Sequence, residues 1–444
     1  MSGSEAGPFG PGLAPAVSAR LPGPKWLVER RASAARQLAG AALPVESEEE
    51  WRYSRIDEID LSGAAPAGRD GEPAGPSSDA GRLLEAVGSR AATVRALAGV
   101  VRTVEVDPEA ASLGVAVVSA AGLDVAPEGL GAVLEPRHDA FTLLADAFGA
   151  DAVLCTVPAG VHLDRPIVVV HELGEHPEGA VVFPRTLVRL GRGARASVVE
   201  LVSSGEGRQL AVPVVEVDLD EGAQLAYTAV QQLGRATWQV AYHSSRLGRG
   251  AVLRSFVAAL GGDYARQLTE SALTGEGSAG ELLAVYLGDG SQVQDFRTFQ
   301  EHVAARTRSE LVFKGAVSGT ARSVYTGLIH MHPGAKRADA SQTNRNLVLS
   351  KGAHADSVPN LDIEENDVRC SHASAVGPID EDQLFYLASR GVPPEVAERL
   401  VLLGFFEDLL SRSPEPGVAD YLREVVVERL SAGVLPGHPH REAS

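Results

Sequence analysis

Glycine recurs at near-constant intervals through the middle of the chain, each time in a short polar corner. Four such corners are Gly193-Ala194, Gly222-Ala223, Gly250-Ala251 and Gly277-Ser278. Successive corners are 29, 28 and 27 residues apart. Alternating apolar runs such as Val252 to Val257 lie between them. A fixed period with strands in every repeat is typical of a solenoid. The spacing therefore predicts a β-helix core, with Gly315-Ala316 and Gly352-Ala353 as later, less regular corners. A β-sandwich with evenly spaced hairpins is the alternative.

The predicted core spans residues 151–378, between segments of different character. Residues 1–24 hold Gly, Pro, Ala and Ser without an apolar period, which predicts a disordered tail. Residues 25–150 form a mixed region, with helices expected over Trp26 to Leu43 and Leu83 to Leu97. Strands are expected there near Val100 to Val106 and Gly114 to Val118. Residues 379–444 are expected to be helical, with a first helix capped by Asp380.

The second helix of this C-terminal region, Glu395 to about Ser411, carries more apolar residues than one neighbouring element covers. They occupy more than one face and include Leu402, Phe405, Phe406 and Leu409. Either a partner protein covers the excess, or all three helices of this region pack on the end of the solenoid. The third helix is expected over Val418 to Leu430.

Composition limits the partners and the compartment. A net charge of -18 repels nucleic acid, which is not expected as a partner. The two cysteines are 215 positions apart, and this predicts a reduced, intracellular protein rather than a disulfide framework. An apolar signal core and a run of about 18 apolar residues are both missing, so neither secretion nor a membrane span is expected. We expect a cytoplasmic location.

The sequence lacks the residue patterns of a phosphate loop, a serine nucleophile elbow and a zinc-protease helix. Gly275, Gly277 and Gly280 match GxGxxG, but they coincide with a predicted corner and indicate a turn. His330 and His332 alternate on a predicted strand and could hold a metal with a third ligand from a neighbouring turn, although such pairs are more often surface residues. Cys155 is expected in the core.

Cys370 and His372 are the strongest candidates for chemistry. They stand at i and i+2 of a predicted strand, which places both side chains on one face. Such a pair is compatible with a buried contact, a nucleophile with its base, or two ligands of a metal site. An iron-sulfur cluster needs four ligands, mainly thiolates, so a second subunit would have to complete its shell.

Beyond these patterns, the run from His302 to Gly391, which ends in NDVRCSHASAVGPIDEDQLFYLASRG, resembles the SufB/SufD family of iron-sulfur cluster assembly scaffold proteins. VPAGVHLDRPIVV from Val157 and EEEWRYSRIDEIDL from Glu48 are similar to upstream signatures of that family. The resemblance implies a right-handed parallel β-helix core flanked by N-terminal and C-terminal helical regions.

The resemblance also implies a function. It implies an accessory, non-enzymatic scaffold that pairs with SufB through its β-helix core and docks the ATPase SufC on its C-terminal helices. Leu402, Phe405, Phe406 and Leu409 would then belong to the SufC dock. ATP-driven dimerisation of SufC would strain the pair and expose groups at its interface. A transient iron-sulfur cluster would be shared there with SufB, with His372 as ligand and Cys370 as a transient one, and no cofactor would stay bound to the isolated chain. Self-pairing into a homodimer is a further expectation.

Three departures favour the SufD branch of this family. Gln342-Thr343 stands where SufB-like chains carry a cysteine after the glutamine, and Cys370 to Ala373 stands where SufB has an EHE-like string. Additional N-terminal cysteines are also missing. Two other functions stay open: an interaction subunit with no direct iron contact, and, from architecture alone, a carbohydrate-active β-helix enzyme. The latter needs acidic residues clustered on a groove, whereas the acids of this core are scattered at corners.

Overall fold

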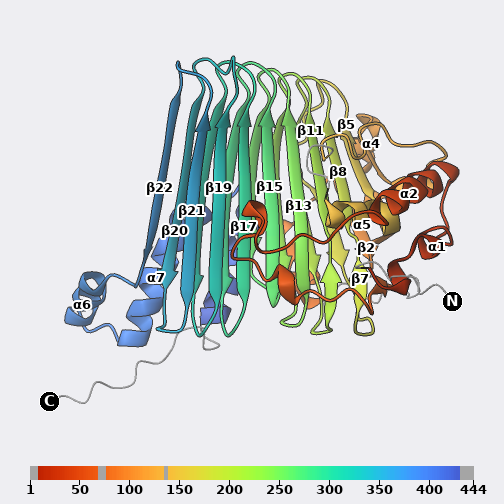
Figure 1. Cartoon of the computed structure of the whole chain (residues 1–444). Coiled ribbons are helices and arrows are strands. Elements are labelled where there is room, and N and C mark those ends of the chain that lie inside the picture. Colours follow the sequence, from red (N-terminus) through yellow and green to blue (C-terminus); the bar gives the residue numbers. More distant parts are fainter. Residues whose placement is uncertain (1–8, 69–76, 135–138, 431–444) are drawn as a thin grey trace.

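The alternating apolar runs form strands that stack in two long sheets, the walls of a β-solenoid (Figure 1). The computed structural model describes residues 9–68, 77–134 and 139–430. Each turn contributes one strand to each of the two sheets, and the solenoid has about 8 turns. Strands of successive turns pair in parallel. The predicted β-helix core is therefore confirmed. The β-sandwich is excluded, because its sheets are antiparallel.

Sheet A is the 12-stranded sheet and sheet B the 10-stranded one. In spatial order, sheet A holds β21 (His354–Ile363), β19 (Arg322–Met331), β17 (Val293–His302), β15 (Tyr264–Leu273), β13 (Trp238–Leu247), β11 (Val214–Leu219), β8 (Arg185–Leu190), β5 (Val153–Val157) and β4 (Ala116–Ser119), with β1 (Ala65–Pro66), β7 (Ala180–Val182) and β10 (Gln209–Ala211) beside this path. Sheet B holds β22 (Arg369–Gly377), β20 (Asp339–Val348), β18 (Arg308–Val317), β16 (Ala279–Gly288), β14 (Val252–Ala259), β12 (Gln224–Gln232), β9 (Arg195–Ser203), β6 (Ile167–Glu172), β2 (Ala92–Leu97) and β3 (Val100–Val106).

The four predicted glycine corners stack in one column where the chain passes from sheet A to sheet B. Gly193, Gly222, Gly250 and Gly277 have φ of 67°, 68°, 64° and 72°, the left-handed region that favours glycine. The N–H of each corner glycine donates to a carbonyl of the next turn, as from Gly193 to Glu221 at 2.8 Å. These bonds fix the stacking of the turns and explain the recurrence. The GxGxxG stretch lies at the Gly277 corner and is a turn, as predicted.

The corner column continues beyond Gly277 without glycine. Arg306 and Arg337 occupy the same position with φ of 58° and 60°. The predicted corner at Gly315 is wrong: this residue lies within β18, and a Cβ there would approach the Tyr286 ring to 1.8 Å. Glycine is needed at position 315 for a close contact and not for a turn. Gly352 does lie at a corner, but at the opposite edge, where the chain returns from sheet B to sheet A.

The helices lie outside the solenoid and cover its N-terminal end and parts of both sheets (Figure 1). They are η1 (Pro11–Leu13), α1 (Pro15–Ser18), α2 (Lys25–Leu38), η2 (Glu49–Trp51), η3 (Ile56–Glu58), α3 (Ser78–Val87), α4 (Pro108–Ser112), η4 (Ala120–Gly122), α5 (Ala140–Phe148), α6 (Glu381–Ser389), α7 (Pro394–Leu410) and α8 (Pro416–Arg429). None of the described helices is long and apolar enough to cross a membrane.

Two expectations for the N-terminal region are wrong. The disordered tail is contradicted for residues 9–24, where Leu13 and Ser18 are buried in the short helices η1 and α1; residues 1–8 lie outside the described part. The single helix expected over Leu83 to Leu97 is in fact helix α3 followed by strand β2. Gly88, with φ of 71°, ends the helix, and burial alternates from residue to residue along β2.

Hydrophobic side chains gather in three main places. The first cluster fills the space between the two sheets, with Val188 and Phe296 from sheet A meeting Val198 and Phe313 from sheet B. The second joins the outer face of sheet B to α3, α7 and α8. The third joins the outer face of sheet A to the N-terminal helices and the segment around Trp51. The solenoid is thus covered on both faces along part of its length.

A buried ion-pair group holds the N-terminal segment against sheet A. The Asp295 carboxylate accepts from the Arg266 guanidinium at 2.9 Å and from the Tyr264 hydroxyl at 2.8 Å, and it lies 2.9 Å from Arg297. Arg266 also donates to the carbonyl of Glu50 at 2.7 Å and lies over the Trp51 ring at 3.8 Å. Burial raises the pKa of Asp295, but the two arginines outweigh it and hold the pKa below its usual value.

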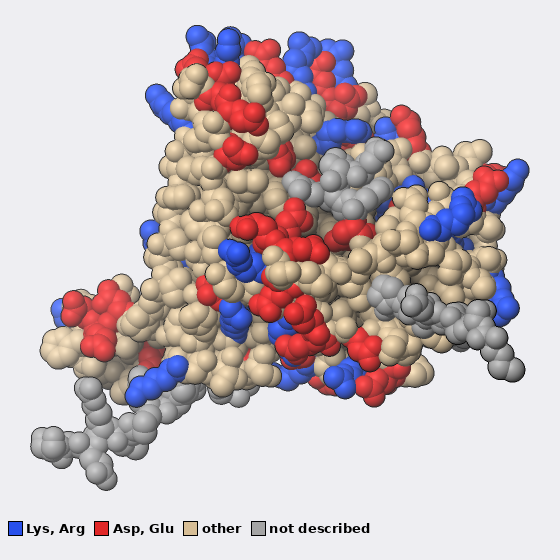
Figure 2. All heavy atoms as spheres, in the orientation of Figure 1, with Lys and Arg blue, Asp and Glu red and all other residues tan. Residues whose placement is uncertain are grey.

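Charge is spread unevenly over the surface. Figure 2 shows acidic side chains gathered across the middle of one face, with a mixture of both signs at the corners. Neighbouring corners exchange ion pairs, such as Arg306 with Glu276 at 2.7 Å. The part of this face near β20 to β22 is mostly uncharged (Figure 2).

Candidate functional site at the open end of the solenoid

The solenoid ends differently at its two ends. At the N-terminal end the antiparallel strands β3 and β4 pair with β2 and β5 and terminate the stack. At the other end, β21 and β22 are the last strands of their sheets, and no described strand pairs with the outer edge of either (Figure 1). A long unpaired edge exposes backbone donors and acceptors that can pair with another chain. We call this last turn, β21 and β22, the open end.

Cys370 and His372 lie on the inward face of the open end. They stand opposite Ala340 and Gln342 of β20, which are 2% and 1% exposed and point into the solenoid. The alternation predicted from the sequence therefore places both side chains on one face, as expected. Among the described residues no further turn stacks beyond β22, and His372 is exposed. Cys370 is half-buried and packs against the apolar cluster that includes Ile329 and Met331.

The surroundings of Cys370 do not activate its thiol. Burial raises the pKa of Cys370 to about 11, and the charge of Asp339 adds to the rise. The thiol is then protonated at neutral pH, whereas the thiolate is the nucleophile and the metal ligand. A self-contained nucleophile is therefore disfavoured. Cys155, the other free cysteine, is fully buried between the sheets, as predicted for a core residue.

The described residues do not complete a ligand shell around this pair. Groups of at least three potential metal ligands within this part of the chain are Glu301 with His330 and His332, and His330 with Asp362 and Glu364. Neither group includes Cys370 or His372. A cluster held by this pair would therefore need ligands from elsewhere.

Two partly exposed apolar side chains also lie on the inward face of the open end. Val376 and Ile363 are both 46% exposed although they stand at inward positions, opposite Asn346 and Met331. Both residues would be covered if one more turn were stacked on the open end. We call Ile363 and Val376 the apolar rim. It could not be predicted from a local sequence pattern, because it depends on the register of the last turn.

The apolar excess of α7 is explained within the chain. Leu402, Phe406 and Leu409 are 0%, 1% and 0% exposed and pack in the cluster that covers sheet B. Their assignment to a docking surface is therefore wrong, because the solenoid and α8 already cover them. Phe405 is partly buried, and its carbonyl accepts from the Lys314 ammonium at 2.8 Å. The chain itself therefore covers this face, but not as expected: α7 and α8 pack on the outer face of sheet B and not on the end of the solenoid, and α6 buries no residue.

The exposed apolar residues lie instead on α6 and the outer side of α7. Helix α6 has no buried residue, and its Phe385 and Tyr386 are 75% and 58% exposed. Leu400 of α7 is also exposed. Between the two helices and the end of sheet B lies a hollow of about 860 Å³, lined by Lys314, Arg345, Tyr386, Leu387, Leu400 and Phe405. Figure 1 shows α6 projecting beyond β22.

The fold and this end define a class of protein: a parallel β-solenoid with helical ends, whose last turn is unpaired and displays a thiol and an imidazole. Comparison with known proteins places the chain within this class. A model of the SUF system FeS cluster assembly SufBD core domain matches residues 173–405. The chain therefore belongs to the SufBD family, whose members take part in iron-sulfur cluster assembly.

Individual relatives agree with this assignment. An iron-sulfur cluster assembly SufBD family protein of Mycobacterium tuberculosis is 35% identical over 297 residues, which cover 64% of this chain and 73% of the relative. The iron-sulfur cluster assembly protein SufD of Escherichia coli is 28% identical over 302 residues, or 67% and 71% of the two chains. SufD of Bacillus subtilis is 30% identical over 280 residues, or 62% and 63%.

Proposed function

We propose that this chain is an accessory scaffold subunit of the SUF system, which pairs through its open end with SufB so that a nascent iron-sulfur cluster forms at the junction. The observation that carries the proposal is the position of His372: inward, exposed and on the last unpaired turn. The chain itself would catalyse no reaction, and the cluster is its cargo. We place this role in the cytoplasm, in line with two free cysteines.

The unpaired edges support pairing with another sheet. Addition of a strand to an exposed edge satisfies backbone groups and is a common mode of protein recognition. Here two edges, those of β21 and β22, are offered together, and the apolar rim of Ile363 and Val376 would be covered at the same time. A second β-solenoid with an open end fits both features. In the absence of SufB, a second copy of this chain could occupy the same end.

Within the paired state, His372 would supply an imidazole ligand to the cluster from this side of the junction. Cys370 would join only transiently, since its thiol must first lose a proton that the free chain holds tightly. The remaining ligands would come from SufB, in keeping with a cluster that needs four.

The docking of SufC is proposed on α6 and the outer side of α7. Phe385, Tyr386 and Leu400 are exposed and lie at the hollow beside sheet B or near it. This location replaces the buried face of Leu402, Phe406 and Leu409. ATP hydrolysis would belong to SufC, because this chain lacks a phosphate loop.

Replacement of His372 with alanine tests the ligand role. We expect the iron and sulfide of the anaerobically purified complex with SufB and SufC to fall by at least about tenfold, since even an outer-shell partner is worth 10–100-fold in metal affinity. The control is Ser374→Ala, two residues further along the same inward face. Undiminished iron and sulfide in His372→Ala, with the complex intact by size exclusion, would contradict the ligand role.

A second candidate function is interaction alone, with no contact to iron. The apolar rim favours it, because Ile363 and Val376 would bury surface on pairing whether or not a cluster forms. In that case His372→Ala would weaken assembly itself, and size exclusion would show free SufB. Loss of iron from an intact complex supports ligation, whereas loss of the complex supports interaction alone.

A further inference from the structure

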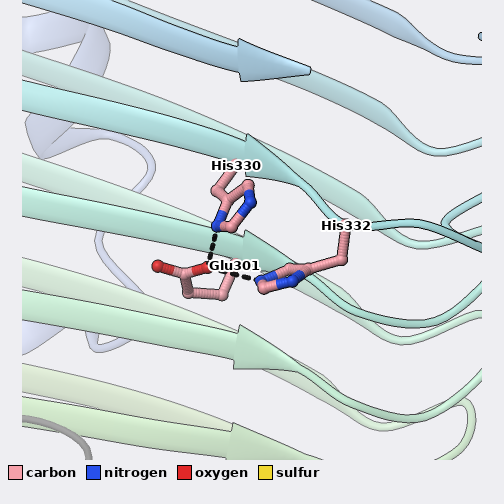
Figure 3. A group of neighbouring side chains, drawn as sticks. All are labelled: Glu301, His330 and His332. Atoms are coloured by element: carbon pink, nitrogen blue, oxygen red, sulfur yellow. Dashed lines mark hydrogen bonds and ion pairs between the residues drawn. The ribbon is translucent and has the colours of Figure 1, made fainter. Parts of the chain in front are cut away.

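A second group of possible ligands lies on the outer face of sheet A. Glu301, His330 and Asp362 stand in register on three successive turns, at the ends of β17, β19 and β21. His332 and Glu364 follow just beyond these strands. Figure 3 shows His330 and His332 both pointing toward Glu301. Stacking of turns thus brings together residues that are far apart in the sequence.

Three ligand atoms meet at one point in this group. Glu301 Oε2 lies 2.9 Å from His330 Nδ1 and 2.8 Å from His332 Nε2. The centroids of the two imidazole rings are 3.7 Å apart. Atoms that share a metal with bonds of about 2.0–2.2 Å lie roughly 3–4 Å from one another, so a small outward shift of these side chains would admit an ion.

The other nitrogen of His330 is oriented as in known metal sites. His330 Nε2 lies 2.8 Å from Glu364 Oε1, and Asp362 Oδ2 is 3.9 Å away. A histidine that binds a metal almost always donates its second N–H to a carboxylate, a carbonyl or water, which fixes the ring and its tautomer. Glu364 can accept that hydrogen bond here. The arrangement is therefore more than a contact between one imidazole and one acid.

The electrostatics of the group favour a cation. Three carboxylates, Glu301, Asp362 and Glu364, surround two imidazoles. His330 lies between two of them, with Nδ1 2.9 Å from Glu301 Oε2 and Nε2 2.8 Å from Glu364 Oε1. Glu301 is 9% exposed, whereas the two histidines are more open to solvent. An ion could therefore enter from the surface and meet an anchored carboxylate.

We infer that Glu301, His330 and His332 form a binding site for one divalent first-row transition metal ion of the Fe²⁺ or Zn²⁺ kind. Two imidazoles and one carboxylate suit these ions and leave coordination positions open. Hard ions such as Mg²⁺ prefer oxygen ligands and should be rejected. Because this site lies on sheet A and uses neither Cys370 nor His372, it does not depend on the proposed function of the open end.

The test is a titration of the full chain with Fe²⁺ under anaerobic conditions and, separately, with Zn²⁺ and Mg²⁺. One Fe²⁺ or Zn²⁺ per chain is expected, with an affinity that falls by at least about tenfold in Glu301→Gln and in His332→Ala, in line with the cost of losing even an outer-shell partner. Co²⁺ absorption in the visible range reports coordination independently of cluster assembly. Thermal unfolding of each variant shows whether the fold is kept.

His354→Ala is the matched control. His354 is an exposed histidine at the start of β21, whose Nε2 lies 3.1 Å from Asp356 but which has no third ligand in the described part of the chain. Its removal should leave binding unchanged. Equal affinity for Mg²⁺, binding unaffected in Glu301→Gln and His332→Ala, or binding that is lost in His372→Ala instead would overturn the inference. The last outcome would assign the ion to the open end.

Discussion

Asp295→Ala is expected to lower the free energy of unfolding by about 3–5 kcal/mol, the cost of breaking a buried ion pair on one side. Asp295 is 0% exposed and is the shared partner of Arg266 and Arg297, which are 2% and 1% exposed. Without its carboxylate, two guanidinium groups would be close together without their shared counter-charge. The same residues hold the segment around Trp51, so this segment should also become more mobile.

Urea unfolding measures this effect, with Glu178→Ala as the control. Glu178 and Arg208 form a fully solvated pair at 2.9 Å, both over 70% exposed, and such a pair contributes about 0–1 kcal/mol. Asp295→Asn keeps the side-chain volume and a hydrogen-bonding oxygen, so this variant should fold even where the alanine variant does not. Its loss of free energy of unfolding should lie between those of Asp295→Ala and Glu178→Ala. A loss for Asp295→Ala no larger than that of Glu178→Ala would show that the buried group does not hold the segment.

Phe406→Ala is expected to cost about 3–5 kcal/mol, as for other large buried aromatic residues. Phe406 is 1% exposed in the cluster that joins α7 and α8 to Val199, Phe256 and Leu283 of sheet B. The cavity would form between the helices and the sheet, so amide exchange in α7 and α8 should accelerate more than in the solenoid.

Phe385→Ala is the matched control, because the same atoms are removed from a side chain that is 75% exposed. It should leave stability nearly unchanged and instead weaken the proposed binding of SufC. If the two phenylalanine variants lost equal stability, the division of the C-terminal helices into a buried and a free face would be wrong.

The solenoid could be predicted because its corners repeat a backbone requirement. Each of these corners needs a residue with positive φ, and glycine adopts this conformation with the least strain. The four corners are therefore marked by glycine, at Gly193, Gly222, Gly250 and Gly277, and the period is visible in the sequence. Arg306 and Arg337 adopt the same φ without glycine, and the period disappears from the sequence although it continues in the structure. Gly315 shows the converse case, since it is glycine for a packing reason.

The helices and strands were easier to predict than the contacts between them. The sequence of α7 shows that its apolar side chains must be buried, but not which element buries them. That element is sheet B, and the contact depends on the path by which the chain returns over this sheet. Similarly, the shared face of Cys370 and His372 follows from strand alternation alone. Glu301 could not be found in this way, because it reaches His330 only through the register between β17 and β19.

Amide hydrogen exchange of the chain, free and in complex with SufB, tests the central claim that the open end is the site of pairing. The amides of β21 and β22 should exchange at least about tenfold more slowly in the complex, because edge groups that face water would become hydrogen-bonded. Strand β3, the other edge of sheet B, is the internal control and should not change. Slowing at β3, or a complex that leaves β21 and β22 as exchangeable as in the free chain, would contradict the account.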